Sequence, residues 1–375
     1  MSDRCYLDLA ARLALRGMGD VEPNPMVGAV IVKDGRIIGM GHHQRFGGPH
    51  AEREALADCR ACGNDPRGST VYVTLEPCRH TGKTLPCTDA LIEAGVARVV
   101  AARPDPNPVS GGGQVVLQTA GISCVFSLES ELATRVSDPF VRRVTTGMPW
   151  VMAKWAQTPD GRLVTNPDEP RWISGEAARR RVHRLRARVD AIMTGIGTVL
   201  ADDPLLTARG VARVRRVAKR VVIDGRLETP TDSAMVRTAR DVPLIVACAA
   251  GATRLFSTRS EALRAAGVEI VEFAAEGERL DLRAVLRLLS EAKAVTTVML
   301  EAGPRLLEAM FAAELVDKAV VHVAGTDVLG TEAAMRSIPA YADRHRLPLV
   351  HSRRVGADLE LTFAKSSGTI AARGN

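Results

Sequence analysis

The 375-residue sequence predicts an α/β protein built from two successive domains. The chain is too long for one ordinary hydrophobic core, and its 46% of hydrophobic residues is enough for a globular fold. Runs rich in valine and isoleucine alternate with helical patterns, and this alternation stops and restarts near residue 147. We therefore expect one α/β domain over residues 1–147 and a second over residues 148–375.

The first domain contains four strand patterns and three helical patterns. The strands are expected at residues 26–32, 36–41, 70–74 and 98–102, and the helices at residues 6–17, 51–61 and 88–94. The last two strands each follow a helix and are therefore expected to be parallel. Pro49 and Pro86 are expected in the first turns of the second and third helices, and Gly95 after the end of the third.

The second domain repeats the alternation. Its strands are expected at residues 151–156, 191–195, 220–224, 243–247, 268–272 and 297–301, with the pattern continuing over 315–324, and its helices at 176–187 and 305–314. Such strands predict an open sheet. The small, polar tail over residues 366–375 is expected to be loose.

Three metal-ligating side chains and one carboxylate have the spacing of a hydrolytic zinc site. His50 and Glu52 form a His-x-Glu motif, and Cys78 and Cys87 follow it, each directly after a proline. One imidazole and two thiolates leave the fourth position of a tetrahedral zinc ion open for water. Glu52 then remains to carry protons to departing ammonia, as in nucleobase deaminases. The alternative is an ordinary surface histidine with two chance cysteines, which does not explain the two Pro-Cys pairs.

Helix starts favour the metal-binding forms of these side chains. His50 and Cys87 are expected at helix N-termini, where the positive end of the dipole favours thiolate over thiol. Four other cysteines are expected to be buried and unreactive: Cys5, Cys59, Cys62 and Cys124. Cys59 and Cys62 have Cys-x-x-Cys spacing, but a second such pair is missing, which disfavours a metal site there.

Charge and composition limit the possible partners. A net charge of +7 and a pI near 9.2 fit phosphorylated substrates or nucleic acid, but the aromatic content of 3% disfavours nucleic acid. The N-terminal residues lack a signal-peptide pattern, and no run of 18 apolar residues occurs. We expect a cytoplasmic enzyme that binds neither membranes nor nucleic acid.

Two motifs in the second domain suggest a phosphate-bearing cofactor. Ala302-Gly303-Pro304 joins a strand to a helix, whose first N–H groups could hold a pyrophosphate, although such a turn is often only a connector. Residues 195–209 are expected to form a long loop, which is costly to retain without a ligand.

The arginine-rich run over residues 179–188 has two interpretations. It could be a nucleic-acid-binding patch, but Val182, Leu185 and Val189 lie on one helical stripe. Most of these arginines are therefore expected on a solvated helix face, with Arg186 as the one that contacts a ligand.

Nearly the whole chain resembles the bifunctional riboflavin-biosynthesis deaminase/reductase family. In the first domain the matching motifs are Pro23-Asn24-Pro25-Met26-Val27-Gly28, His50-Ala51-Glu52, the run from Pro77 to Cys87, and Asp105-Pro106-Asn107-Pro108. In the second domain they are Trp172-Ile173, the segment from Gly195 to Arg209, and Glu301-Ala302-Gly303-Pro304. The eight-residue gap between Cys78 and Cys87 is the most specific of these features.

The resemblance implies a cytidine-deaminase-like α/β/α domain followed by a dihydrofolate-reductase-like α/β domain. The first would use one Zn²⁺ per chain to deaminate a diamino-hydroxy-phosphoribosylamino-pyrimidine. The second would use NADPH to reduce the ribose of the resulting 5-amino-6-(5-phosphoribosylamino)uracil to a ribityl chain. The substrate is thus a phosphorylated pyrimidine, and we expect a homo-oligomer, either a dimer or a tetramer.

The resemblance also implies ligand-binding residues. The pyrimidine or sugar phosphate in the first domain would contact Asn24, His43, His80 and Lys83. The substrate in the second domain would contact Lys154, Arg186, Leu206, Arg209 and Glu301. NADPH would contact Ala156, Trp172, Thr198, Asp202, Gly303, Pro304, Arg305 and Leu306.

The chain departs from the family pattern at several positions. Thr158 and Pro159 replace the usual Ser-Leu before Asp-Gly, Pro170 replaces a serine, and residues 324–330 lack the usual Ala-Pro-x-x-Leu-Gly. Arg53 occupies a position that is usually apolar.

Three alternatives to the bifunctional enzyme are considered. They are a deaminase with a degenerate reductase-like domain, a tRNA deaminase, and a purely structural zinc module. Structural zinc sites usually have four protein ligands, and only His80 could be a fourth here.

Overall fold

The structure is a computed structural model, and it describes residues 2–82, 84–163, 172–214, 216–325 and 347–365. The chain divides into two compact units, one from Met1 to Gly147 and one from Met148 to Ser366. Pro170, Lys83, residues 326–330 and the tail over 366–375 lie outside the described residues. The two units are described separately below.

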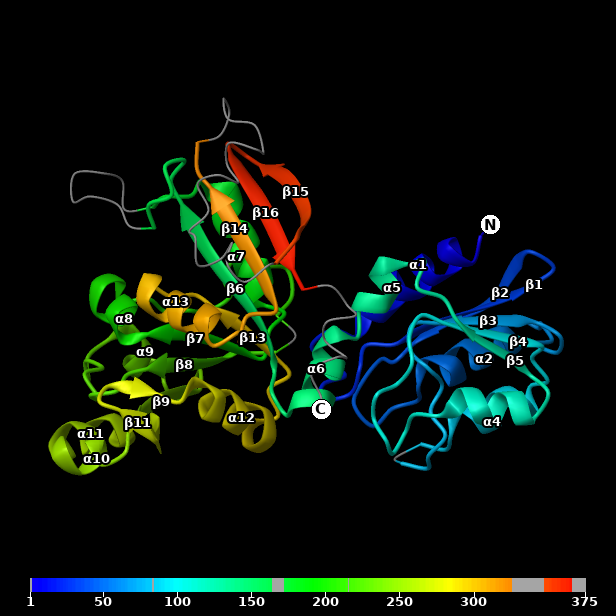
Figure 1. Cartoon of the computed structure of the whole chain (residues 1–375), viewed down its shortest axis with the longest axis horizontal. Helices are drawn as coiled ribbons and strands as arrows, with labels where there is room; N and C mark the ends of the chain where they lie inside the picture. Colours follow the sequence, from blue (N-terminus) through cyan, green and yellow to red (C-terminus); the bar gives the residue numbers. More distant parts are fainter. Residues whose placement is uncertain (1, 83, 164–171, 215, 326–346, 366–375) are drawn as a thin grey trace. The chain divides into compact units, whose positions relative to one another are not determined.

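The first unit is built on a five-stranded sheet with the order β2-β1-β3-β4-β5 (Figure 1). Its strands are β1 (Gly28–Lys33), β2 (Arg36–His42), β3 (Thr70–Val73), β4 (Arg98–Ala101) and β5 (Ser123–Phe126). β1 is antiparallel to β2 and β3, whereas β3, β4 and β5 are parallel. The prediction that the strands after the helices are parallel is therefore confirmed.

Helices cover both faces of this sheet, because strand residues alternate between two hydrophobic clusters. Val71, Val73 and Val99 pack with α2 (Ala51–Ala61), α3 (Cys87–Glu93) and α4 (Gly113–Thr119). Tyr72 and Val100 pack on the other face with α1 (Asp3–Ala14) and α5 (Glu131–Arg135). The short 3₁₀ helix η1 (Leu15–Gly17) follows α1, and α6 (Asp138–Thr146) closes the unit. The α/β/α prediction is confirmed.

The second unit contains a nine-stranded sheet with the order β10-β9-β8-β7-β13-β6-β14-β16-β15. Its strands are β6 (Trp150–Gln157), β7 (Ala191–Gly195), β8 (Lys219–Ile223), β9 (Leu244–Ala249), β10 (Glu269–Phe273), β13 (Thr297–Leu300), β14 (Lys318–Val323), β15 (Leu349–Val355) and β16 (Asp358–Ala364). The strands from β10 to β14 in this order are parallel, and the β15–β16 hairpin is antiparallel. A separate hairpin comprises β11 (Ala275–Glu276) and β12 (Arg279–Leu280).

Alternate residues of these strands again face two cores. Val298 and Leu300 pack with α12 (Leu282–Lys293) and α13 (Pro304–Ala312), whereas Met299 belongs to the cluster on the opposite face. That opposite cluster includes α7 (Glu176–Arg186), α8 (Ile196–Asp202), α9 (Ala234–Arg237), α10 (Ala252–Leu255) and α11 (Ser257–Ala265). Val182 and Val189 are buried and Leu185 packs beside them, as the helical stripe predicts.

Several local predictions were wrong. Residues 196–202 form the helix α8 rather than part of a long loop. Pro49 precedes His50, the N-cap of α2, and Pro86 is itself the N-cap of α3, so neither proline lies in a first turn. Cys5 and Cys62 are exposed, whereas Cys59 and Cys124 are buried as expected.

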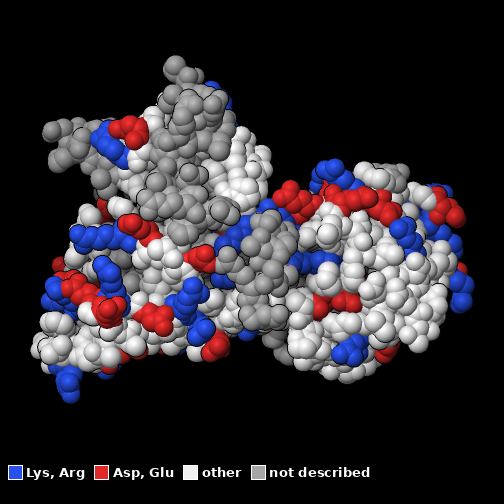
Figure 2. Space-filling model, in the orientation of Figure 1, with Lys and Arg blue, Asp and Glu red and all other residues white. Residues whose placement is uncertain are grey.

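The described residues include no helix with the length and apolar character needed to cross a membrane. On the visible face of each unit, basic and acidic side chains are intermixed (Figure 2).

Candidate active sites

The candidate metal centre lies where two helices of the first unit begin. His50 is the N-cap of α2, Cys87 is the first residue of α3, and Cys78 lies on the loop after β3. His50 Nδ1 is 3.4 Å from the Sγ atoms of both cysteines, and the three ligand atoms lie within 4.8 Å of one another. The structure thus brings together side chains that are separated by up to 37 residues in sequence.

Close backbone packing fixes this arrangement. A Cβ on Gly41 of β2 would lie 2.3 Å from the backbone nitrogen of Ala55, so α2 can approach the sheet only because this residue is glycine. A Cβ on Gly113, the first residue of α4, would lie 1.9 Å from the carbonyl oxygen of Pro77. These contacts hold both the His50 helix and the Cys78 loop in place.

The donor set fits a zinc ion. The Cys87 side chain and backbone N–H interact with the Cys78 sulfur and hold the pKa of Cys78 well below its usual range. The same contact raises the pKa of the Cys87 thiol. The two sulfurs thus share a proton beside the His50 ring, whose pKa is raised by its interaction with Cys78, and a divalent cation would replace the protons held by this group. One histidine and two cysteines leave one tetrahedral position open, as catalytic zinc requires.

Glu52 lies beside this group in the first turn of α2. Its side chain is almost completely buried, with 3% relative exposure. Burial and the charge of the nearby Cys78 together raise the pKa of Glu52 to about 7, against the lowering effect of His50. A carboxyl group with this pKa exchanges protons readily near neutral pH.

Asn24 and His43 form a hydrogen-bonded pair next to the candidate metal ligands. His43 Nδ1 is 2.8 Å from the Pro49 carbonyl and therefore donates to it, which leaves Nε2 to accept from the Asn24 amide at 3.2 Å. The ring of His43 meets the ring of His50 edge to face, with centroids 5.4 Å apart. Burial lowers the pKa of His43, which favours the neutral ring that this hydrogen-bond pattern requires.

The loop between Cys78 and Cys87 carries further polar groups. The Nδ1 atom of His80 is buried and has no hydrogen-bond partner among the described residues. Thr84 Oγ1 lies 3.4 Å from His50 Nε2. His80 thus offers an unused polar atom beside the site, whereas Lys83 lies outside the described residues.

Two arginines hold this loop and its neighbour. Arg53 Nε donates to the carbonyl of Leu85 at 3.1 Å, and its Nη2 donates to that of Pro86 at 2.9 Å. Arg79 donates to the carbonyl of Gly111. In the sequence Arg53 is only a departure from the family pattern, whereas the structure shows that it binds the backbone just before Cys87.

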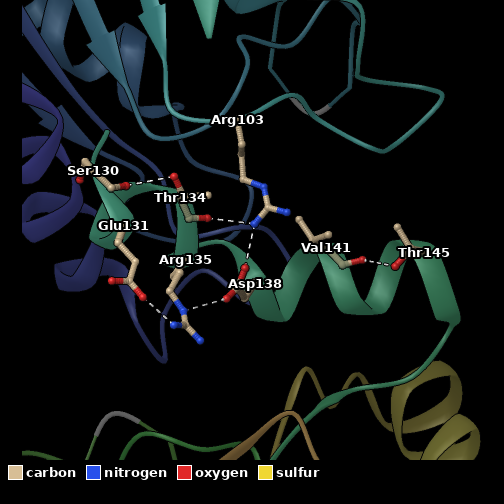
Figure 3. Close-up of polar contacts among 8 residues, drawn as sticks. All are labelled: Arg103, Ser130, Glu131, Thr134, Arg135, Asp138, Val141 and Thr145. Carbon is tan, nitrogen blue, oxygen red and sulfur yellow. Dashed lines mark hydrogen bonds and ion pairs between the residues drawn. The ribbon is translucent and has the colours of Figure 1, made fainter. Parts of the chain in front are cut away.

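Glu76 is a structural carboxylate that the sequence analysis missed. It precedes the Pro77-Cys78 pair, and its two oxygens accept from the backbone N–H groups of Asp105 at 2.9 Å and Gln114 at 2.8 Å. Its own N–H donates to the carbonyl of Arg103. The side chain of Arg103 is buried and binds Asp138 and the carbonyl of Thr134 (Figure 3).

The second candidate site lies at the carboxyl ends of the central strands β6, β7 and β13, the usual ligand position in an open α/β sheet. Arg186 of α7 makes a two-pronged ion pair with Glu301, with distances of 2.6 and 2.9 Å. Burial lowers the pKa of Lys154, and the charge of Glu301 partly offsets this effect. The structure thus groups Lys154, Arg186 and Glu301 from three elements.

The segment after α8 folds against α7. Leu206 is buried with a positive φ of 48°, a left-handed conformation that is costly for this residue. Arg186 Nη1 donates to the carbonyl of Thr207 at 3.2 Å, and His183 Nδ1 lies 3.2 Å from the backbone nitrogen of Arg209. Leu206 and Arg209 are therefore held close to Arg186, and His183 is a neighbour that the sequence analysis did not identify.

The expected cofactor-binding residues come from the starts of two helices and from β6. The Gly303 N–H donates to Thr198 Oγ1 at 3.2 Å, which joins the start of α13 to α8. Pro304, Arg305 and Leu306 form the first turn of α13, Asp202 ends α8, and Ala156 lies in β6. Trp172 is exposed and lies under the guanidinium of Arg179, 5.6 Å from the ring centroid.

Two protein families match this sequence. Residues 1–103 match the cytidine and deoxycytidylate deaminase zinc-binding region, and residues 149–361 match the RibD C-terminal domain. The second match alone spans more than half of the chain.

Relatives match over almost the full length. The riboflavin biosynthesis protein RibD of Actinobacillus pleuropneumoniae is 36% identical over 97% of this chain and 95% of its own, and that of Escherichia coli is 38% identical over 96% and 98%. A solved Thermotoga maritima structure, a diaminohydroxyphosphoribosylaminopyrimidine deaminase/5-amino-6-(5-phosphoribosylamino)uracil reductase, superposes with a TM-score of 0.79. It is 32% identical, and the match covers 96% of this chain and 98% of that one.

Proposed function

The chain belongs to the RibD family of bifunctional deaminase/reductases of riboflavin biosynthesis, and from this membership we propose how its own residues perform the two reactions. The first unit is a zinc-dependent deaminase that acts on 2,5-diamino-6-(5-phosphoribosylamino)pyrimidin-4-one. The second unit is an NADPH-dependent reductase that converts the ribose of the deaminated product to the ribityl chain. The division into catalytic halves at residues 147 and 148 is part of this proposal.

In the deaminase half, His50, Cys78 and Cys87 would hold the zinc ion. When bound, zinc supplies the Lewis acidity that makes a water nucleophilic at neutral pH. A carboxylate oxygen of Glu52 would accept a proton from the attacking water and would donate it to the departing amino nitrogen. Its burial and its pKa of about 7 support both steps, because either protonation state is accessible near neutral pH.

The neighbouring polar residues orient the pyrimidine. The Asn24 amide, held in position by His43, contacts the polar edge of the substrate pyrimidine. The Nδ1 atom of His80, which has no partner among the described residues, provides another contact. Lys83 is proposed as the point charge that binds the sugar phosphate.

In the reductase half, Lys154, Arg186 and Arg209 bind the anionic substrate, and Leu206 contacts it beside Arg186. Glu301 is neutralised by Arg186 and retains acceptor capacity for N–H groups of the pyrimidine. NADPH supplies the hydride. The backbone at the start of α13, from Gly303 to Leu306, holds its phosphates, and Ala156, Trp172, Thr198 and Asp202 complete its site.

Two further points are proposals. We place the enzyme in the cytoplasm, because a reducing compartment keeps Cys78 and Cys87 available as ligands. We also propose a homo-oligomer, a dimer or a tetramer, on the family resemblance. Light scattering coupled to size-exclusion chromatography measures the mass of the protein in solution. The mass of a monomer would reject the homo-oligomer proposal.

The grouping of Lys154, Arg186 and Glu301 carries the reductase proposal against a degenerate second domain, because an inactive domain would not need to retain a buried cationic cluster. The test supplies zinc-loaded protein with the diaminopyrimidine and measures ammonia, and then adds NADPH and measures its oxidation. Both signals support the bifunctional assignment. Ammonia release without NADPH oxidation would indicate a degenerate reductase. If neither signal is observed, the pyrimidine assignment is rejected and tRNA adenosine is the next substrate to test.

The Glu52→Gln variant tests whether Glu52 transfers the proton in the deaminase reaction. We expect this variant to lose ammonia release and to keep NADPH oxidation when it is given the deaminated substrate. Unchanged ammonia release would reject the role proposed for Glu52.

A further inference from the structure

Two carboxylates of strand β16 face helix α7. Asp358 and Glu360 alternate along the strand with Leu359 and Leu361, which belong to the core that contains α12 and α13 on the opposite face of the sheet. Asp358 is buried, and its Oδ2 atom accepts from the N–H of Gly175, the N-cap of α7, at 2.7 Å. This charge-assisted hydrogen bond fixes the start of the helix.

Glu360 holds the middle of the same helix. It is only 1% exposed, and its carboxylate accepts from the guanidinium of Arg181. His322 and Arg353 also contact this carboxylate, and both lie directly opposite it on the neighbouring strands β14 and β15. Burial raises the pKa of Glu360, but its contacts with His322 and Arg181 hold the pKa below the usual value, so the carboxylate is charged. Of these three partners, Arg181 is the one that connects the sheet to α7.

The other end of α7 holds the segment proposed to bind the reductase substrate. Arg186, the last residue of the helix, pairs with Glu301 and donates to the carbonyl of Thr207 at 3.2 Å. Three positions earlier, His183 Nδ1 lies 3.2 Å from the backbone nitrogen of Arg209. α7 thus connects the carboxylates of β16 to the residues around the substrate.

The length of helix between these contacts is short. Arg181 and Arg186 are separated by about 7.5 Å along the helix axis, and backbone hydrogen bonds keep this part of the helix rigid. A shift or rotation of the helix at Arg181 therefore moves Arg186 as well. Groups that bind a reacting substrate lose much of their effect when they are displaced by about 1 Å.

We propose that Glu360, acting through Arg181, is a positioning residue for the reductase reaction. It fixes α7 so that Arg186 and the segment over residues 206–209 are in place to bind the substrate. The proposal rests on the substrate contacts proposed above for Arg186 and Arg209. The alternative is an ion pair that contributes only to stability, whose loss would lower the Tm and leave substrate binding unchanged.

The test compares Arg181→Gln with Arg353→Gln in the full-length enzyme. Both side chains are partly exposed and pair with Glu360, but one belongs to α7 and the other to β15. We expect Arg181→Gln to raise the KM for the deaminated substrate roughly tenfold with little change in kcat, because the disturbed contacts bind the substrate in its ground state as well. Arg353→Gln should leave this KM unchanged, and Arg181→Lys should recover part of the loss.

Hydrogen exchange gives a measurement that does not depend on activity. Peptides that cover residues 203–212 should exchange faster in Arg181→Gln than in Arg353→Gln, because the N–H of Arg209 and its neighbours lose their fixed partners on α7. Equal KM values in the two variants would overturn the proposal, whatever the two substitutions do to the Tm.

Arg186→Gln separates this proposal from the substrate contact on which it rests. If Arg186→Gln raises the KM and Arg181→Gln does not, the positioning role of Glu360 is rejected and the substrate contact is retained. If Arg186→Gln leaves the KM unchanged, the substrate contact is rejected. Exchange of residues 203–212 then decides whether Glu360 positions this segment, and equal exchange in Arg181→Gln and Arg353→Gln would exclude it.

Discussion

Arg103 and Asp138 form a buried ion pair that connects the loop of Cys78, a proposed metal ligand, to the last helix of the first unit (Figure 3). The Arg103 guanidinium donates to Asp138 Oδ1 at 2.8 Å, and both side chains are less than one-tenth exposed. The backbone carbonyl of Arg103 accepts from the N–H of Glu76, two residues before Cys78. The position of the Cys78 loop therefore depends on a charge pair that does not contact the metal ligands.

Asp138→Ala is expected to destabilise the first unit by about 3 kcal/mol, because it leaves Arg103 as a buried charge without its partner carboxylate. Hydrogen exchange of peptides from residues 98–146 measures this loss. All three tryptophans lie in the second unit, so their fluorescence transition is an internal reference that should not move. The control is Asp160→Ala, which breaks an exposed pair with Arg162 in the second unit and should leave the exchange of these first-unit peptides unchanged. Equal effects of the two substitutions would contradict the structural role of the buried pair.

Arg53→Leu is expected to weaken zinc binding by roughly tenfold, because the carbonyls of Leu85 and Pro86 lose the donor that fixes them beside Cys87. Competition with a chromophoric chelator measures the zinc affinity. Arg60→Leu on the exposed side of the same helix is the matched control. The prediction fails if both variants bind zinc as the unchanged protein does.

Removal of zinc is expected to separate the two activities. A chelator should abolish ammonia release, because all three proposed ligands belong to the first unit. NADPH oxidation with the deaminated substrate should continue, since the residues proposed for that reaction belong to the second unit. Parallel assays before and after zinc is restored provide the measurement, and a comparable loss of both activities would contradict it.

Glu301→Gln is expected to move the alkaline limb of the reductase pH profile to lower pH. Burial lowers the pKa of Lys154, Glu301 raises it, and Arg186 lowers it. Removal of the Glu301 charge therefore lowers the pKa of Lys154 further, and the ammonium group that we propose binds the substrate loses its proton at a lower pH. The pH dependence of kcat/KM shows the shift, and Glu308→Gln, an exposed change on α13, should leave the limb in place. A limb that stays in place, or moves to higher pH, in Glu301→Gln would exclude this electrostatic coupling.

The sequence predicted elements best where a local pattern determined them. Residues 51–61 and 191–195 have the predicted bounds, since an amphipathic run and a buried β-branched run are strong local signals. The helix α8 was missed because its seven residues include glycine and threonine and span too few turns to show a periodic pattern. The β15–β16 hairpin was missed because charged residues interrupt its first strand.

The candidate sites differ in how far sequence could define them. A histidine, two cysteines and a glutamate carry their chemistry in the residue type, so their grouping could be anticipated. The roles of Arg53 and Glu76 could not, because each acts through backbone groups that only the fold brings near.

The central strand β13 has a consequence for the order in which the enzyme forms. It lies between β6 and β7, although it comes more than 100 residues after β7 in the chain. A growing chain can complete the first unit long before residues 297–300 leave the ribosome, whereas β6 and β7 cannot reach their final spacing until then. During synthesis, the deaminase therefore matures first, and the reductase waits for almost the whole chain.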